Sequence, residues 1–392
     1  MAKPLEGVVV LDLSRVLAAP YTGMILADMG ADVIKVERPG KGDDSRAYGP
    51  FKNGESVYYM SLNRGKRSMT LNMKSEEGKQ ILKDLVKQAD VLVENFRGGT
   101  MDKLGLGYDV LNPRLIYSAC TGFGMTGPYK HDPAYDVIVQ GMGGIMSITG
   151  QEGGEPTKVG ASIGDITAGI FSAVGIMIAL YNREKTGKGQ LVDVSMLDCQ
   201  VAILENAIAR YMNAGVSPKP IGNRHASITP FQSLKTKDGY VIVAVGNDTL
   251  WQKFCGLIER PDLAADPRFT TNPLRTENVK VLGEELNKTF QTKTMDEWLH
   301  ILKEGGVPVG PINDVERVIK DPAVIAREMI VTTHHPIAGD VEMAGVPIKL
   351  SGTPGSVDAP APTLGQHTRE ILKEKLDMDD ALIDQLYADK TL

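Results

Sequence analysis

The sequence is short of several features that would mark particular classes of protein. Only three cysteines occur among its 392 residues, Cys120, Cys199 and Cys255, and they are far apart. Because no CxxC pair exists, neither a zinc site nor a disulfide framework is expected, and a reducing cytoplasm fits best. The net charge of −6 argues against nucleic acid as the main partner, since phosphate binding requires a basic face.

Long apolar runs are also missing. The longest uncharged apolar stretch, Ile166 to Tyr181, has 16 residues, fewer than the roughly 20 needed to span a bilayer. We therefore expect a buried core helix there and no membrane partner. Residues 1–14 contain one lysine and a short apolar run that Asp12 interrupts, so no signal peptide is expected. The six histidines show no metal-binding spacing, and no metal site is predicted.

What is present is an alternation of strands and helices. Residues 8–13 form a continuous apolar run typical of a buried parallel strand, and Pro20 opens a helix that extends to about Met29. A second strand at 32–36 completes a β-α-β unit. Further strands are expected at 91–95, 115–120 and 191–196, with an amphipathic helix at 74–89. This order predicts a doubly wound α/β sheet.

The character of the chain changes after residue 213. Residues 214–230 are rich in Gly, Pro and Asn and are predicted to form a linker. Residues 231–320 contain one clear β segment, at 240–245, followed by mostly helical pattern. From about residue 330 the chain returns to short β-like pieces and ends in a charged helix near 367–387.

A glycine string suggests nucleotide binding only at first sight. Gly122, Gly124 and Gly127 form GxGxxG after a predicted strand, but a loop, residues 128–133, follows where the motif requires a helix. A nucleotide oxidoreductase stays open as an alternative, because Glu37 ends the first β-α-β unit as a ribose-binding acid would.

Asp165 has two interpretations. It stands immediately before the apolar helix, where aspartate is a common N-cap. The same place would keep its carboxylate ionised through the helix dipole, so that it could act as a covalent nucleophile. Two basic residues elsewhere in the chain, Arg38 and Arg97, directly follow predicted strands, where doubly wound sheets bind ligands. Each is either a phosphate ligand or a solvated surface charge.

Together these segments resemble the family III CoA-transferases, which include formyl-CoA:oxalate and carnitine CoA-transferases. The resemblance covers nearly the whole chain. It is carried by PLEGVVVLDLSRVLAAP, ADVIKVERPGKGDDSR, NRGKRSMTLNMKSEEGK, DVLVENFRGGTMDKLGLGY, NPRLIYSACTGFGMTGPY, AYDVIVQGMGGIMSITG, GASIGDITAGIF, REKTGKGQLVDVSMLD, GVPVGPINDV and LGQHTREIL.

The resemblance implies a Rossmann-like large domain built from both chain ends and a smaller α+β middle domain. Residues 1–213 and 330–392 would form the large domain, and 231–329 the small one. It also implies an obligate homodimer of interlocked chains. Asp165 falls on the family nucleophile, which implies that CoA is carried as a thioester on this residue. Acyl-CoA would then be a substrate, and no permanently bound cofactor is expected.

The resemblance also implies ligand contacts. The implied CoA contacts are Arg38, Leu71, Asn72, Met73, Lys74, Asn95, Phe96, Arg97, Lys103 and Tyr135. Lys103 stands where several relatives have Arg, and a lysine meets a phosphate as a point charge. Acid contacts are expected from Leu17, where oxalate-specific relatives have Gln, and from Gly222, Asn223, Arg224 and His225, where they have a glycine loop. For Arg224 a structural salt bridge is an equal alternative.

We therefore expect transfer of CoA from acetyl-, succinyl- or formyl-CoA to oxalate or another small dicarboxylate. Two alternatives remain. A 2-methylacyl-CoA racemase shares the fold, but its catalytic His stands at the position of Tyr135, and neutral Tyr is a poor base at pH 7. A non-catalytic acyl-CoA-binding dimer is the other, although simple binding gains nothing from a desolvated carboxylate at Asp165.

Overall fold

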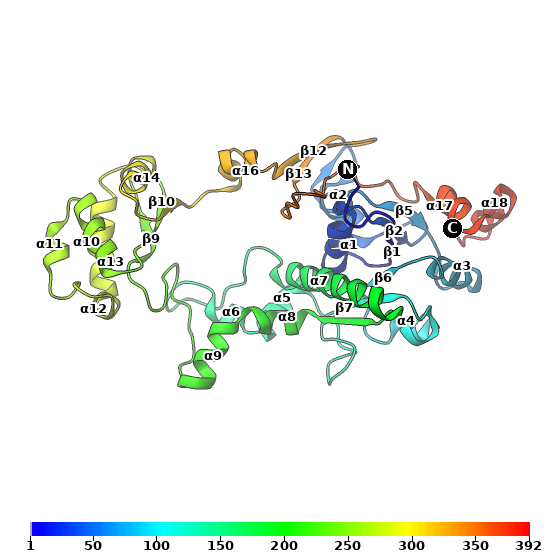
Figure 1. Cartoon of the computed structure of the whole chain (residues 1–392), viewed down its shortest axis with the longest axis horizontal. Coiled ribbons are helices and arrows are strands. Elements are labelled where there is room, and N and C mark those ends of the chain that lie inside the picture. Colours follow the sequence, from blue (N-terminus) through cyan, green and yellow to red (C-terminus); the bar gives the residue numbers. More distant parts are fainter. Residues whose placement is uncertain (1) are drawn as a thin grey trace. The chain divides into compact units, whose positions relative to one another are not determined.

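The computed structural model describes residues 2–392, which form two compact units. The first unit contains residues up to 145, 158–215 and 322–392, so both ends of the chain belong to it. In Figure 1 the N-terminal strands, in blue, and the C-terminal helices, in red, both belong to this unit. The second unit contains residues 146–157 and 216–321. The second unit is larger at its start than the predicted small domain, because it includes residues 146–157 and most of the predicted linker at 214–230. It ends at residue 321, and the chain rejoins the first unit at 322 instead of the predicted 330.

The first unit is built on six strands that are all parallel to their neighbours. They are β1 (Val9–Asp12), β2 (Asp32–Glu37), β5 (Arg67–Thr70), β6 (Val91–Glu94), β7 (Ile116–Thr121) and β8 (Leu191–Ser195), in the spatial order β5-β2-β1-β6-β7-β8. The predicted parallel α/β sheet is confirmed. Strand β5 was not predicted, because its four residues include Arg67 and Ser68 and show no apolar run.

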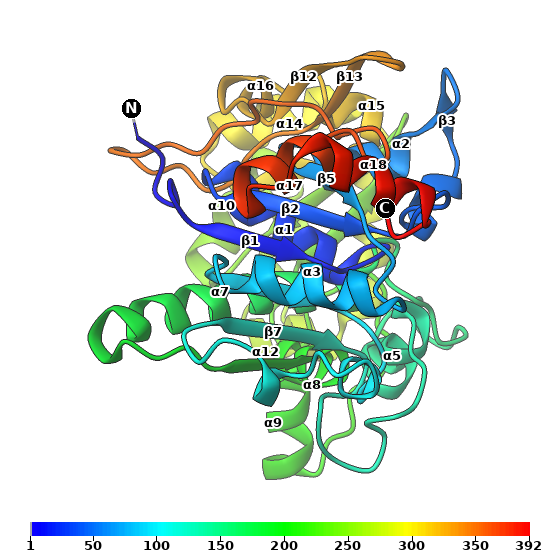
Figure 2. The ribbon, with the colours of Figure 1, turned by 90° about the vertical axis from the view of Figure 1, so that its right-hand side faces the viewer.

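Helices cover both faces of this sheet (Figure 2). Helices α3 (Glu76–Val86), α17 (Thr368–Leu376) and α18 (Asp380–Ala388) share one core with Leu11 of β1. Helices α1 (Ala18–Asp28), α7 (Ile163–Thr186) and α8 (Met196–Ile203) share the other core with Val10. Neighbouring residues of one strand enter opposite cores because side chains alternate across a sheet, and this explains the continuous apolar run.

The order of the strands determines where the sheet binds ligands. From β1 the chain proceeds to β2 and β5 on one side, and β6, β7 and β8 lie on the other side. The reversal between β1 and β6 is a topological switch point, where the loops beyond the carboxyl ends of the strands diverge and leave a crevice. The segments that follow β1 and β6 begin at Leu13 and Asn95.

Helix α7 differs from its prediction. It begins at Ile163 and ends at Thr186, so it is longer than the predicted stretch. Only part of it is buried, because one face exposes large apolar side chains: Ile170, Phe171, Val174, Met177, Ile178 and Tyr181. The predicted core helix is therefore only partly buried in the single chain. By length and composition alone α7 could also cross a membrane, but core helices of soluble proteins pass the same test.

The first unit contains further short elements. They are the hairpins β3 (Phe51–Lys52) with β4 (Glu55–Ser56) and β12 (Ile330–His335) with β13 (Gly339–Ala344), the helices α2 (Val57–Asn63), α4 (Thr100–Lys103), α5 (Asp136–Met142), α9 (Glu205–Ala214) and α16 (Pro322–Ala326), and the 3-10 turns η1 (Asp44–Ala47) and η2 (Tyr108–Val110). The short helix α6 (Ile145–Ile148) begins at the last residue before the second unit.

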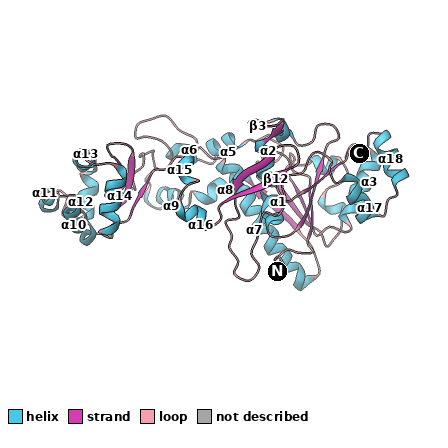
Figure 3. Cartoon of the chain, turned by 90° about the horizontal axis from the view of Figure 1, so that it is seen from above, coloured by secondary structure: helices cyan, strands magenta, loops and turns pink. Residues whose placement is uncertain are grey.

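The second unit is a small α+β fold (Figure 3). Its antiparallel sheet has the order β11 (Val309–Pro311), β10 (Tyr240–Ala244), β9 (Phe231–Lys235), of which the sequence predicted only the middle strand. Its helices are α10 (Asp248–Leu257), α11 (Pro261–Ala265), α12 (Asn272–Glu277), α13 (Val279–Phe290), α14 (Met295–Glu304) and α15 (Val315–Val318). Its core is mostly aliphatic and includes a few aromatic rings, with Phe290 stacked on Trp298 at a centroid distance of 4.5 Å.

Candidate active site at the switch point of the parallel sheet

Asp165 lies inside the first turn of α7. The helix begins at Ile163 and its N-cap residue is Ser162, so Asp165 is the third helical residue and the N-cap interpretation is wrong. A carboxylate in this turn still benefits from the positive end of the helix dipole. Ser162 also lies in a GxSxG string that was not singled out from the sequence, but no strand precedes it, as a nucleophile elbow requires.

The carboxyl group of Asp165 is unusual in having no partner. It makes no hydrogen bond or ion pair with any residue between 2 and 392, and its side chain is largely withdrawn from solvent. Burial, and secondly the negative charge of Asp136, raise its pKa from the ordinary 3.8 to about 7. A strongly perturbed carboxyl group at a switch point is a candidate for catalysis.

Asp136 is fixed beside the start of α7. Its Oδ1 accepts a hydrogen bond from the Gly164 amide at 2.8 Å, and its Oδ2 accepts one from the buried Gln140 side chain at 2.7 Å. A side chain at position 164 would come within 2.7 Å of Val139, so Gly164 permits α5 and α7 to pack closely. Gly169 has the same role, because a Cβ there would meet the Ala18 carbonyl at 2.5 Å. These two glycines therefore serve helix packing.

Asp165 lines a cavity of about 290 Å³, here called the nucleophile cavity. The predicted residues Leu17, Asn95, Arg97 and Tyr135 all line it. Its complete lining is Arg15, Val16, Leu17, Ala18, Asp44, Tyr48, Asn95, Phe96, Arg97, Cys120, Gly122, Asp132, Pro133, Ala134, Tyr135, Asp165 and Met196. The structure thus brings the predicted nucleophile together with residues from the loops after β1 and β6.

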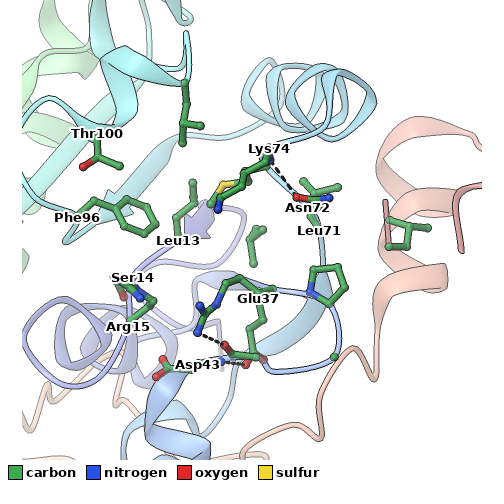
Figure 4. A pocket seen from close by; sticks show the side chains of 18 of the residues that line it. Leu13, Ser14, Arg15, Glu37, Asp43, Leu71, Asn72, Lys74, Phe96 and Thr100 are labelled. Carbon is green, nitrogen blue, oxygen red and sulfur yellow. Dashed lines mark hydrogen bonds between the residues drawn. The ribbon is translucent and has the colours of Figure 1, made fainter. Parts of the chain in front are cut away.

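A second cavity, here called the cationic cavity, has a volume of about 830 Å³ (Figure 4). It is lined by seven of the predicted CoA contacts: Arg38, Leu71, Asn72, Met73, Lys74, Phe96 and Lys103. Arg15 and Phe96 line both cavities, so the two adjoin at these side chains. In Figure 4, Arg15 and Phe96 lie on one side of the cationic cavity, and Lys74 and Asn72 lie across it.

Arg15 was missed by the sequence analysis. The turn that carries it is strained, because Val16 has φ +68°, in the left-handed region that a β-branched residue rarely adopts. Two side chains from other loops hold this turn. The Val16 amide donates to both carboxylate oxygens of Asp43, at 3.1 and 3.3 Å, and Asn95 bonds both the amide and the carbonyl of Arg15. A charged residue in the short segment after the first strand was the available signal.

Asp43 belongs to a buried network of charges under this turn. Lys35 contacts Asp43 at 2.9 Å and also donates to the Ser14 carbonyl, while Lys66 contacts Asp12 at 2.8 Å. Burial alone would raise the pKa of Asp12, but Lys66 and Lys35 together hold it below its usual value. Burial opposes the charge of Asp43 too, yet Lys35 holds its pKa well below the ordinary value. Such a paired network makes the turn rigid.

The loop predicted to bind the acid lies in the second unit. Gly222, Asn223 and Arg224 line a cavity of about 930 Å³ there, and Arg224 forms a salt bridge of 2.8 Å with Glu152. His225 does not line that cavity; its ring lies 5.4 Å from that of Phe231. The salt-bridge alternative for Arg224 is thus observed, and an acid-binding role for this loop stays a prediction.

Three other predictions concern absences or replaced motifs. Among residues 2–392 no group of three potential metal ligands is found. The glycine string at 122–127 continues as loop until α5 begins at Asp136, so it lacks the helix of a dinucleotide site. At the position of the racemase histidine, Tyr135 is 71% exposed, and the nearest histidine in sequence, His131, contacts the Gly98 carbonyl at 3.0 Å.

Comparison with known proteins decides the family. A family profile described as CoA-transferase family III matches residues 5–368. The chain belongs to CoA-transferase family III. This confirms the predicted family.

The chain is similar to known proteins along nearly its full length. Succinyl-CoA:glutarate CoA-transferase from Homo sapiens is 41% identical over 98% of this chain and 89% of its own. Acetyl-CoA:oxalate CoA-transferase from Acetobacter aceti is 44% identical over 95% of each chain. The crystal structure of a CAIB/BAIF family protein from Brucella suis has a TM-score of 0.88 at 42% identity, covering 96% of this chain and 100% of that one. The prediction of a CoA-transferring enzyme is confirmed at this level.

Proposed function

We propose that this family III enzyme moves CoA between short dicarboxylic acids through covalent intermediates on Asp165. The observation that carries the proposal is the unpaired, largely buried Asp165 carboxylate, which opens into a cavity that adjoins the cationic cavity. Burying a carboxylate without a partner destabilises a protein, so its retention indicates a chemical role. The relatives are named for glutarate and oxalate, and both acids carry two carboxyl groups.

The proposed reaction balances in four steps. An Asp165 carboxylate oxygen attacks the acyl-CoA carbonyl carbon, and the CoA thiolate leaves a mixed aspartyl-acyl anhydride. The thiolate then attacks the Asp165 carbonyl, which releases the donor acid and forms the aspartyl-CoA thioester. The acceptor carboxylate attacks this thioester, giving a new anhydride and free thiolate. Attack of the thiolate on the acceptor's carbonyl yields the new acyl-CoA and restores Asp165.

The chain supplies binding and charge stabilisation for these steps. Arg38, Lys74 and Lys103 line the cationic cavity and would hold the phosphate groups of CoA. Helix α1 begins at Ala18 without a side-chain cap, and no acceptor for the Ala18 amide is found between residues 2 and 392. Ala18 lines the nucleophile cavity, so its amide can stabilise an oxyanion formed at Asp165.

The proposed substrates are a short acyl-CoA, which donates CoA, and a small dicarboxylic acid, which accepts it. We propose acetyl-, succinyl- or formyl-CoA as donors and oxalate or a longer dicarboxylate as acceptor. Leu17 lines the nucleophile cavity and is apolar, so it offers no hydrogen bond in the place of the glutamine of oxalate-specific relatives. This favours longer dicarboxylates, with an apolar segment between the two charges, over oxalate.

We further propose an obligate interlocked homodimer in the cytoplasm. The apolar face of α7 supports the dimer, since contiguous exposed apolar patches mark protein interfaces. The three cysteines are free and buried, which suits a reducing compartment.

The decisive test is mass spectrometry of the enzyme after incubation with succinyl-CoA or acetyl-CoA and then with hydroxylamine. Hydroxylamine converts an aspartyl anhydride or thioester into a hydroxamate of defined added mass. We expect this mass on the peptide that contains Asp165, and its loss in Asp165→Ala. A folded wild-type enzyme that remains unmodified with both donors would contradict the covalent mechanism.

A further inference from the structure

Arg15 has a guanidinium group that is only half satisfied by the protein. Its Nη1 contacts Asp44 Oδ2 at 2.9 Å, in a pair whose side chains are 40% and 38% exposed. Its Nε is buried and has no acceptor among residues 2–392. A ligand cannot reach the buried Nε, but Nη2 makes no hydrogen bond with residues 2–392 and is not buried. The terminal edge formed by Nη1 and Nη2 is therefore the one that can bind a carboxylate.

The protein holds Arg15 in place on three sides. Its guanidinium carbon lies 5.4 Å from the centre of the Phe96 ring, which backs the charge. Asn95 accepts from the Arg15 amide at 2.8 Å and donates to its carbonyl at 2.7 Å. Asp43 holds the next residue, Val16, in its strained conformation. Backbone strain that is held by buried polar groups beside a cavity is typical of a functional position.

Arg15 shares the nucleophile cavity with Asp165, but the two form no ion pair. An acid with two carboxylates has one that must react at Asp165 and one that does not react. We infer that Arg15 binds the second, non-reacting carboxylate of the dicarboxylic acid and thereby selects dicarboxylates over monocarboxylates. This inference rests on the proposed function, since it identifies which side chain sets the class of acid.

Arg97 is the other cation that lines the nucleophile cavity. It is exposed, so water satisfies its guanidinium and no ligand is required to do so. Arg15 also lines the cationic cavity, and a contact with CoA phosphate is therefore the competing role for it. The two roles differ in their consequences, because every substrate carries CoA or receives it, whereas only some acids carry a second carboxylate.

The test compares acids that differ only in that carboxylate. With acetyl-CoA as donor, which lacks a free carboxylate, kcat/KM is measured for glutarate and for pentanoate in wild type, Arg15→Gln, Arg15→Lys and Arg97→Gln. In Arg15→Gln we expect kcat/KM for glutarate to fall about 100-fold, while that for pentanoate changes less than about 3-fold. Arg15→Lys keeps the charge without the fork and should lose about 10-fold for glutarate. Arg97→Gln should leave the glutarate-to-pentanoate ratio unchanged.

An equal loss for both acids, together with a raised KM for acetyl-CoA, would assign Arg15 to CoA and overturn the inference. An unchanged ratio in both Arg15 variants would overturn it as well. The hydroxylamine test with acetyl-CoA is independent of Arg15 and should give the same modification of Asp165 in Arg15→Gln as in wild type. Absence of that modification in wild type would refute the covalent mechanism itself. If Arg15→Gln does not fold, the milder Arg15→Lys carries the comparison.

Discussion

Asn95 holds the backbone of Arg15 on both sides, although 80 positions separate the two residues in the chain. Its side-chain oxygen accepts from the Arg15 amide at 2.8 Å, and its nitrogen donates to the Arg15 carbonyl at 2.7 Å. One residue follows β6 and the other follows β1, so this double contact joins the two loops that diverge at the switch point. It places both loops around one cavity.

Loss of this contact should loosen the proposed acid site without unfolding the sheet. In Asn95→Ala the Arg15 amide and carbonyl lose their partners and the strained turn loses one of its two supports. We expect kcat/KM for glutarate to fall about 10- to 100-fold, for a displacement near the reacting groups, with secondary structure preserved by circular dichroism. Asn313→Ala in the second unit is the matched control. Wild-type kinetics in Asn95→Ala would show that Asp43 alone supports the turn.

The rate of covalent modification should follow the ionisation of Asp165. In the proposed mechanism only the ionised carboxylate attacks, and burial together with Asp136 raises the pKa of Asp165 to about 7. The single-turnover rate with acetyl-CoA should therefore rise with pH up to about 7 and then level off. Asp136→Asn removes the negative charge and keeps an oxygen for the Gly164 amide, so the midpoint of this rise should move to lower pH.

The control for this shift is Asp198→Asn, which changes an exposed carboxylate of α8 outside the nucleophile cavity. Its pH profile should match wild type. A midpoint that stays in place in Asp136→Asn would mean that burial alone sets the pKa of Asp165.

Replacing Asp165, the proposed nucleophile, should stabilise the fold while it abolishes activity. The folded pKa of Asp165 lies above the ordinary 3.8, so its ionisation opposes folding. The penalty is absent below pH 4, grows between pH 4 and 7, and is complete above pH 7. Asp165→Asn should therefore raise the free energy of unfolding at pH 8 by about 1–3 kcal/mol and by much less at pH 4.5. Denaturant titration at both pH values measures this, and equal stability at pH 8 would contradict an uncompensated buried charge.

Lys74 should contribute to the binding of CoA and not to the chemistry. It lines the cationic cavity, is exposed, and its ammonium has no ion-pair partner between residues 2 and 392. In Lys74→Ala we expect KM for acyl-CoA to rise about 3- to 10-fold with kcat little changed, as for an exposed contact with one phosphate. Lys79→Ala removes a lysine that pairs with Glu76 outside the cavity and should leave KM unchanged. A fall in kcat at constant KM would instead place Lys74 near the reacting atoms.

A charge on the open face of α7 should disrupt the dimer that we propose. Ile178 is 63% exposed in the single chain, and burying an aspartate against a partner costs several kcal/mol. Ile178→Asp should convert the dimer to monomer or aggregate in size-exclusion chromatography with light scattering. Val110→Asp, at a residue that is 62% exposed in η2, is the control and should remain dimeric. A dimeric Ile178→Asp would mean that this face is not the interface.

Much of the scaffold was predictable because its signals are local. The apolar runs at 8–13 and 115–120 predict buried strands by themselves, and β1 (Val9–Asp12) and β7 (Ile116–Thr121) lie within one residue of those limits. Asp165 was singled out because an acid before a long apolar helix is visible in the sequence. The resemblance of the chain to its family implied the CoA contacts, and seven of these residues line one cavity. The strands β5 and β9 were not predicted because polar residues interrupt their apolar pattern. They form strands through pairing with neighbouring strands.

By itself the sequence determined the succession of strands and helices, the parallel sheet and the family, since periodicity and motif spacing depend on residues that are close along the chain. Only the tertiary structure decided that Arg15 shares a cavity with Asp165, that Asp136 raises the pKa of that carboxyl group, and that one face of α7 is open. These features follow from the order in which distant strands pair and from how helices pack on them. Charge, burial and strain at a site are properties of that packing, and no local pattern encodes them.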